Sequence, residues 1–173
     1  MSSVPGWFQR KFDFSFPIEQ YPNLMARLRG TPARLEETLR GVSRELLVRK
    51  PSSDKWSAQE HAGHLADLEP LWTARVDDFL KGGEELTAAD LTNRKTHEAD
   101  HNGRAAEEIL AQFRAGRMNL VNRVGELRPE IFARSMLHPR LKQPMRLVDH
   151  LFFVAEHDDH HLAMILELVW AKS

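Results

Sequence analysis

Cysteine is absent from the 173-residue sequence. Its absence excludes a disulfide framework, a zinc site built on thiolates and a cysteine nucleophile. Any metal ion must therefore be bound by histidine, aspartate or glutamate side chains. The chain has nine histidines and 25 acidic residues from which such a site could be built.

An excess of charge of either sign is also absent. The sequence has 24 Lys and Arg against 25 Asp and Glu, which gives a formal net charge of −1. A protein that binds nucleic acid usually carries a basic patch that neutralises phosphates. No such tract occurs here, so we expect no nucleic-acid partner.

Long hydrophobic runs are missing as well. No segment approaches the roughly 20 consecutive apolar residues that a membrane-spanning helix needs. Residues 1–17 contain no apolar run long enough for a signal peptide. We therefore expect a cytoplasmic protein that does not bind membranes.

The overall composition is typical of a folded globular protein. Hydrophobic residues make up 42% of the chain and charged residues 28%. A chain of this length fits one compact domain. We predict a single domain over residues 1–173, in which an aromatic-rich leader, residues 1–17, packs on the rest.

Apolar residues recur at helical spacing in four long segments. The segments span residues 18–42, 57–81, 105–127 and 145–170. The first is interrupted by Gly30-Thr31-Pro32, where we expect a break or kink. Ser57 followed by Glu60 predicts a capping box at the start of the second. No convincing strand pattern occurs, so the predicted fold is all-α; a four-helix bundle, with loops at 84–103 and 129–144.

Three of the nine histidines fall within residues 155–165, AEHDDHHLAMI. His157 and His161 are four positions apart, so on a helix they are neighbours on one face and can bind one ion. They share this face with apolar residues that are expected to point into the bundle. Asp158 and Asp159 are expected to face water.

A third inward histidine is available on the second predicted helix. Either His64 or His61 could face the pair on the fourth helix. Several buried imidazoles without partners would be costly, and a shared metal ion would satisfy them together. The simpler alternative is that these histidines form ordinary hydrogen bonds in the core.

The same residues resemble the signature of a known family. Trp56-Ser57-x-x-Glu60-x-x-x-His64-Leu65 and Glu156-His157-x-x-His160-His161-Leu162-Ala163 are similar to the DinB-like family, which includes the YfiT-type metal-dependent hydrolases and bacterial thiol S-transferases. The resemblance covers nearly the whole chain.

The resemblance implies that the metal ligands are His64, His157 and His161, which decides between His61 and His64. It further implies a divalent metal, usually zinc or nickel, with water in the remaining positions, and often a homodimer. It does not select a reaction, because members range from thiol-dependent transferases and isomerases to proteins of unassigned activity.

A second histidine pair, His97-Glu98-Ala99-Asp100-His101, matches the H-E-x-x-H motif of zinc proteases. Its flanks are polar and Asn102-Gly103 follows at once, so we interpret it as a solvated loop or helix start. Because this loop joins the second and third helices, it could still fold over one end of the bundle and touch a substrate.

Three further residues are candidates for roles at the site. Glu60 and Asp67 are placed to hold the free N–H of His64, although capping and solvation explain them equally. Arg117 lies in the apolar stripe of the third helix, so it needs an anion. That anion is either a structural carboxylate or the carboxylate of a substrate, and we assign Arg117 as a substrate-binding candidate.

Three neutral ligands would leave an ion with open positions, which is typical of a catalytic site. The ion could activate water for hydrolysis, or hold a low-molecular-weight thiol as thiolate for transfer to a small-molecule electrophile. We favour thiol transfer. The alternative is a non-catalytic metal-binding or stress-response protein in which the metal is structural.

Overall fold

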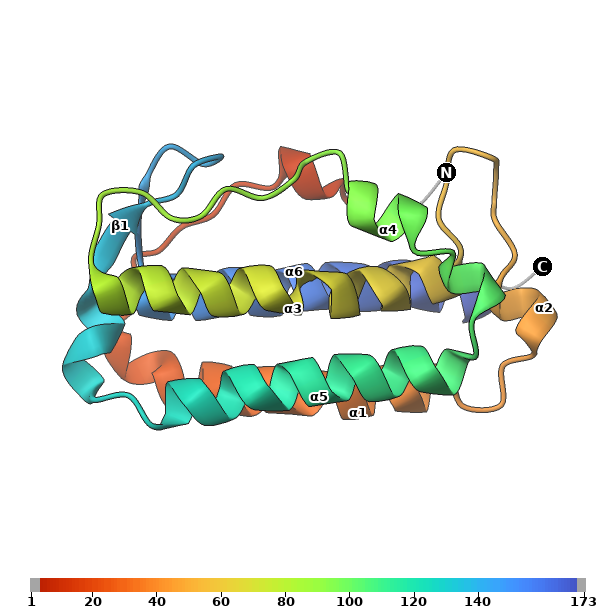
Figure 1. The fold of residues 1–173 in the computed structure, drawn as a ribbon, viewed down its shortest axis with the longest axis horizontal. Helices are drawn as coiled ribbons and strands as arrows, with labels where there is room; N and C mark the ends of the chain where they lie inside the picture. The colour runs from red at the N-terminus through yellow and green to blue at the C-terminus, as the bar shows by residue number, and fades with distance from the viewer. Residues whose placement is uncertain (1–3, 171–173) are drawn as a thin grey trace.

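The computed structural model describes residues 4–170. Four long helices form the bundle: α1 (Tyr21–Leu39), α3 (Ala58–Lys81), α5 (Ala106–Gly125) and α6 (Leu147–Trp170). They form two layers, with α3 beside α6 and α1 beside α5 (Figure 1). The predicted all-α four-helix bundle is confirmed. Residues 1–3 of the predicted leader, and 171–173 of the predicted domain, lie outside the described range.

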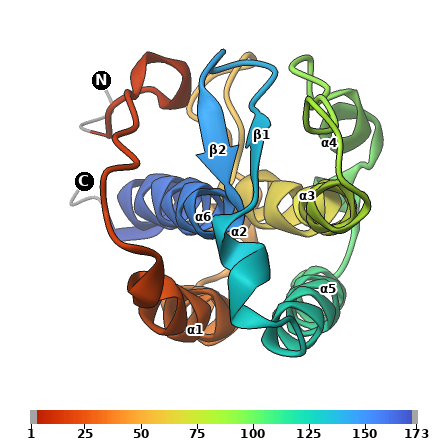
Figure 2. The ribbon, with the colours of Figure 1, turned by 90° about the vertical axis from the view of Figure 1, so that its left-hand side faces the viewer.

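A third layer covers the α3–α6 pair on the side away from α1 and α5. Figure 2 shows the N-terminal segment, a β-hairpin and the segment after α3 side by side in this layer. The hairpin pairs β1 (Ser135–Leu137) with β2 (Pro144–Arg146) in antiparallel register. Each strand has three residues, too short for an alternating pattern, so our expectation of a plain loop at 129–144 was wrong.

The N-terminal segment is attached to the bundle through aromatic side chains. Trp7 and Phe12 both lie edge-on or tilted against Phe153 of α6, with ring centroids 5.1 and 5.0 Å away. Burial of such rings is the main stabilising contribution that an irregular segment can make. Residues 4–17 thus form part of the cover over α6.

Helix α1 is continuous through residues 30–32, so the predicted break is absent. Proline inside a helix cannot donate to the carbonyl four residues earlier. Here that carbonyl belongs to Leu28, and it accepts a hydrogen bond from Nη1 of Arg117 at 3.4 Å. The tertiary partner replaces the missing bond. The helix also ends at Leu39, earlier than expected.

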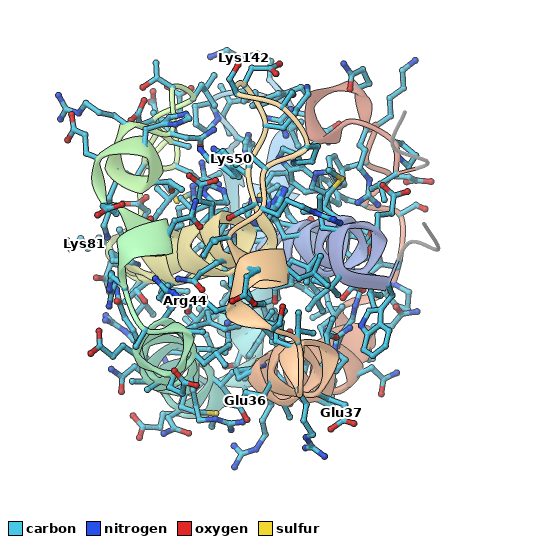
Figure 3. The ribbon with its side chains drawn as sticks, turned by 90° about the vertical axis from the view of Figure 1, so that its right-hand side faces the viewer. Glu36, Glu37, Arg44, Lys50, Lys81 and Lys142 are labelled. Atoms are coloured by element: carbon cyan, nitrogen blue, oxygen red, sulfur yellow. The ribbon has the colours of Figure 1, made fainter. Side chains whose placement is uncertain are left out.

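Helix α3 begins as predicted. The Ser57 hydroxyl accepts from the Glu60 N–H at 3.1 Å, and the Glu60 carboxylate accepts from the Ser57 N–H at 2.9 Å. Glu60 also pairs with Lys50, which lies on the connector that follows the short helix α2 (Arg44–Leu47) (Figure 3). The capping box therefore fixes the register of α3 and the histidines on it.

The segment between α3 and α5 contains a short helix, α4 (Arg94–Glu98), and a 3-10 turn at His101–Gly103. Both pack on α3. No helix within residues 4–170 has the combined length and apolar character that a bilayer crossing requires.

Two apolar clusters make up the core, and a polar layer lies between them along the bundle. Each long helix contributes one residue to this layer: Thr31, Glu69, Arg117 and Asp158. Arg117 donates to Glu69 at 2.6 Å and also pairs with Asp158, whose carboxylate accepts from the Thr31 hydroxyl at 2.9 Å. The network joins all four helices at one level.

Candidate metal centre

Three histidines from two helices meet at one point. His157 and His161 are one turn apart on α6, and their Nε2 atoms are 3.2 Å apart. His64 of α3 faces them, so that one ligand nitrogen from each ring lies within 4.8 Å of the other two. All three side chains are buried. The histidines that the resemblance selected are therefore together in space.

The apolar face that His157 and His161 share predicted that they point into the centre of the four helices. The structure places them on another side of α6. Helix α6 is buried on two sides. Asp158 points into the bundle, where it is 0% exposed and bound to Arg117, so the expectation that it faces water was wrong. His157 and His161 point towards the covering layer. Asp159 lies nearer the surface and pairs with Arg27 and Arg34.

The ring of His64 is oriented by a hydrogen-bond chain. The Thr96 hydroxyl donates to the carboxylate of Asp67 at 2.9 Å. Its oxygen is then the acceptor for His64 Nδ1, which lies 3.0 Å away. This arrangement places the ring proton on Nδ1 and leaves Nε2 as the ligand atom. Asp67 thus reaches His64 through Thr96 rather than directly.

The H-E-x-x-H segment supplies part of this arrangement. Its His101 is 1% exposed, and its Nε2 lies 2.8 Å from the same Asp67 carboxylate oxygen. The prediction of a solvated loop is therefore wrong for His101, although His97 is exposed. His101 lies so close to Gly63 that any side chain at that position would overlap its ring. The segment orients a ligand from outside rather than binding an ion.

His61, the alternative third ligand, occupies a different position. Its Nδ1 lies 2.8 Å from Nδ1 of His161. One ring therefore donates to the other, and a proton on His161 Nδ1 leaves Nε2 of His161 free for an ion. His61 orients His161 in the way that Thr96 orients His64.

Burial keeps the imidazoles neutral. It lowers the pKa of His64 to about 3, and the neighbouring His61 adds to this effect. Burial lowers the pKa of His157 and His161 well below the ordinary value, and the adjacent imidazoles have the same effect. Neutral imidazole is the form that binds metal ions, so the rings need not lose a proton first.

Two other predicted site residues lie elsewhere. The Glu60 carboxylate accepts from the Ser57 N–H at the helix start and pairs with Lys50, and neither contact reaches His64. Arg117 is 0% exposed and saturated by two carboxylates. The substrate-binding assignment of Arg117 does not agree with this position, whereas the structural carboxylate that we also considered does.

The triad forms part of the wall of a cavity of about 560 Å³. Helices α3 and α6 form one wall. The rest is lined by Trp7 and His138 of the covering layer and by Trp56 of the connector before α3. The rings of Trp7 and Trp72 lie edge-on to His157, with centroids 5.0 and 5.4 Å away. A small molecule can therefore reach the ligand atoms from a largely aromatic space.

The arrangement fits a divalent ion such as zinc. Two imidazoles at about 2.0–2.1 Å from a tetrahedral ion place their ligand atoms roughly 3.3 Å apart, close to the separation of His157 and His161. Three histidines would leave a further coordination position, on the side of the cavity.

Sequence reasoning missed Thr96, the cavity and its tryptophans. No local pattern marks Thr96, because its role depends on how the 82–105 segment folds back on α3. The H-E-x-x-H spacing of residues 97–101 was the available signal for this segment. The motif suggested metal ligands, whereas the segment contributes hydrogen bonds that orient one. Trp72 lies in the apolar stripe of α3, where no local pattern separates a packing residue from one that lines a cavity.

Comparisons with known proteins agree with this picture. The model of the DinB superfamily matches residues 27–165. The uncharacterized protein YuaE of Bacillus subtilis (strain 168) is 29% identical over 150 residues, which cover 79% of this chain and 92% of YuaE.

A solved structure with a similar fold is YfiT from Bacillus subtilis, described as a probable metal-dependent hydrolase with an unusual four-helix bundle topology. The two structures superpose with a TM-score of 0.78, at 22% sequence identity, over 92% of this chain and 91% of YfiT. At this identity the similarity is evidence for the fold.

Proposed function

The chain belongs to the DinB superfamily, and from this premise we propose that it is a divalent-metal-dependent enzyme acting on a small molecule. The reaction is either hydrolysis or transfer of a low-molecular-weight thiol. The observation that carries the proposal is the position of three neutral imidazoles in the wall of an open cavity. YfiT, with a similar fold, is described as a probable metal-dependent hydrolase, which supports the proposal.

Under this proposal His64, His157 and His161 hold zinc or nickel. The ion would supply Lewis acidity, which lowers the pKa of a water or a thiol at its open position. The chain orients the ligands through Thr96 and His61. The tryptophans around the triad give it a largely apolar surrounding, which would strengthen electrostatic interactions in the cavity.

Thiol transfer is the second form of the proposal, and one observation favours it. Because the chain has no cysteine, the thiol would come from a cosubstrate, and this absence agrees equally with hydrolysis. The two carboxylates that line the cavity, Asp54 and Asp90, are exposed and bonded within their own loops. A metal-bound thiol loses its proton without a strong neighbouring base, because the ion itself stabilises the thiolate.

A non-catalytic role for the metal is the alternative. An ion that only joined α3 to α6 would stabilise the fold and need no access from outside. Structural zinc sites normally have four protein ligands, whereas this group provides three beside a cavity. This difference is our reason for preferring an enzyme. Homodimer formation and cytoplasmic location stay predictions.

The test begins with the metal content of protein purified without added metal or chelator. Zinc- and nickel-loaded protein is then incubated with chromogenic esters, and with chromogenic electrophiles in the presence of several small thiols. Ester turnover without thiol indicates a hydrolase, and turnover that requires thiol indicates a transferase. Stabilisation by metal without any turnover would support the structural role.

His157→Ala should abolish both metal binding and turnover. His150→Phe is the matched control, because His150 is also buried on α6 but lies outside the triad. A His157→Ala variant with full activity and no bound metal would overturn the proposal. Failure of the unmodified protein to bind any divalent ion would return the histidines to a role in core packing.

A further inference from the structure

Several hydrogen-bond donors in the cavity lack acceptors. We propose that they form a subsite, here called the arginine subsite, that binds the oxyanion group of the substrate, a carboxylate or a phosphate on a small organic molecule. That the anion belongs to a substrate rests on the proposed function. The subsite consists of Trp72, Arg75, His138 and Arg140.

Within residues 4–170, Arg75 is a buried cation without an ion pair; Asp78 is the carboxylate that acts on it, from beyond ion-pair distance, and Asp78 accepts from the Thr87 N–H. The Arg75 side chain belongs to α3 and is 1% exposed. Nε donates to the Thr87 carbonyl at 2.9 Å, and Nη1 lies 3.1 Å from Nε2 of His138. Arg75 forms no ion pair with any residue of the described range. Arg117, the other fully buried arginine, is instead balanced by two carboxylates.

The contact between Arg75 and His138 joins two donors. Nδ1 of His138 accepts from the N–H groups of Arg140 and Leu141, at 3.2 and 3.1 Å. The proton of the neutral ring must therefore be on Nε2. Burial, with Arg75 and Arg140 nearby, lowers the pKa of His138 to about 3, so the ring is neutral at pH 7. Nε2–H and the guanidinium thus face each other, and an anionic acceptor would satisfy both.

Two further donors, on residues that line the same cavity, have no hydrogen-bond partner within residues 4–170, although the Arg140 guanidinium lies over the rings of Trp7, Phe8 and Phe153. One is Nη2 of the half-buried Arg140, and the other is the indole N–H of Trp72, whose side chain is 2% exposed. Burial lowers the pKa of Arg140, and no carboxylate opposes this effect. Unsatisfied buried donors cost free energy, and guanidinium groups bind carboxylate and phosphate in bidentate geometry.

The arginine subsite is adjacent to the triad. The ring of Trp72 is near both sites: its centroid lies 5.6 Å from the Arg75 guanidinium and 5.4 Å from the His157 ring centroid. The ring of Trp7 is likewise near both, 5.9 Å from the Arg140 guanidinium and 5.0 Å from the His157 ring. Because the arginine subsite and the triad line the same cavity, one small substrate could place its anionic group at the arginines and its reactive group at the metal.

The test compares three probes of one shape: 3-phenylpropanoate, 2-phenylethylphosphonate and the neutral 3-phenylpropanamide. Dissociation constants are measured by calorimetry on the full chain, both zinc-loaded and in EDTA. We expect the better of the two anions to bind at least tenfold more tightly than the amide in both conditions. The comparison of the two anions shows whether the subsite prefers carboxylate or phosphate.

Arg140→Met should remove most of this preference for an anion, and Arg75→Lys, which retains the charge, should reduce it less. Arg29→Met, at an exposed arginine of α1 outside the cavity, is the matched control and should have no effect. Equal binding of anions and amide would overturn the proposal. So would an anion preference that survives Arg140→Met, or one that exists only with zinc bound.

The two proposals can fail separately. If zinc does not bind but the anion preference persists in EDTA and depends on Arg140, the metal-dependent function is wrong and the arginine subsite stands. If zinc supports turnover but anions bind no better than the amide, the enzyme acts on neutral substrates and the subsite is wrong.

Discussion

The orientation of His64 depends on a hydroxyl group 32 residues away in the sequence. A neutral imidazole carries its proton on either nitrogen, and only the tautomer with the proton on Nδ1 leaves the lone pair of Nε2 free for an ion. Thr96 selects this tautomer because its own proton is already donated to Asp67. Residues outside the ligand set therefore decide whether a ligand is correctly prepared.

Replacement of Thr96 by valine should weaken zinc binding by about 10- to 100-fold, the usual effect of removing the partner of a metal-bound histidine. The affinity is measured by competition with a chromogenic chelator. Thr96→Ser retains the hydroxyl and should bind zinc nearly as well as the unmodified protein. Equal affinities for the valine and serine variants would show that the hydroxyl does not orient His64.

Helices α3 and α6 differ from α1 and α5 because the covering layer buries each of them on a second side, and α6 is the case where this misled the assignment. One side of α6 meets α1 and α5 through Asp158, and the other meets the covering layer through His157 and Phe153. A helical wheel separates apolar from polar positions, but it cannot say which of two buried faces meets which neighbour. This is why the histidines and Asp158 were assigned to the wrong sides.

Arg117→Met should lower the free energy of unfolding by roughly 3–5 kcal/mol, because it leaves two buried carboxylates without a cation. The control is Arg114→Met, which breaks a half-exposed pair with Glu36 and should cost less than about 1 kcal/mol. Urea unfolding measures both. If Arg117 bound substrate instead, its replacement would raise KM and leave the unfolding free energy nearly unchanged.

The close contact between α3 and the 82–105 segment depends on Gly63. A methyl group there would overlap the ring of His101, so Gly63→Ala should destabilise the fold by roughly 1–3 kcal/mol, as overpacking does. It should also weaken zinc binding, because Thr96 belongs to the displaced segment.

The control is Gly30→Ala. Gly30 lies inside α1, and an added methyl group would meet no atom within 4 Å. This substitution should stabilise the protein by about 0.5–1 kcal/mol. If both alanine variants gave the same change in urea unfolding, the packing of His101 against Gly63 would not be a constraint.

At the scale of the whole molecule, the buried histidines make the fold sensitive to acid. Burial lowers the pKa of His150 well below 6.5, and the nearby Arg75 adds to this effect. Below about pH 6.5 the unfolded chain therefore binds a proton that the folded chain does not. The contribution of His150 to the free energy of unfolding is therefore fully present above about pH 6.5 and decreases as the pH falls.

In the His150→Phe variant the unfolded chain should bind one proton fewer at acidic pH, because the imidazole that takes it up is missing. In EDTA, the decrease in the free energy of unfolding between pH 6 and pH 4.5 should become smaller by about 1.4 kcal/mol per pH unit. Urea titrations at several pH values measure the slopes. Parallel curves for the variant and the unmodified protein would show that His150 takes up its proton equally in both states.

The sequence by itself determined the four helices, the capping box at Ser57 and the absence of cysteine ligands and nucleophiles, because these follow from local periodicity and composition. It also indicated His157 and His161 as neighbours, since spacing of four on a helix fixes that relation. The resemblance added His64. The short strands and the continuity of α1 through Pro32 could not be predicted from the sequence, because both depend on partners far away along the chain.

Only the tertiary structure decided which buried face of α6 carries the site, that Arg117 is enclosed by two carboxylates, and that a third layer builds a cavity over the histidines. The physical reason is the same in each case. A hydrogen bond or an ion pair depends on the relative placement of segments, and periodicity within one segment contains no information about its neighbours.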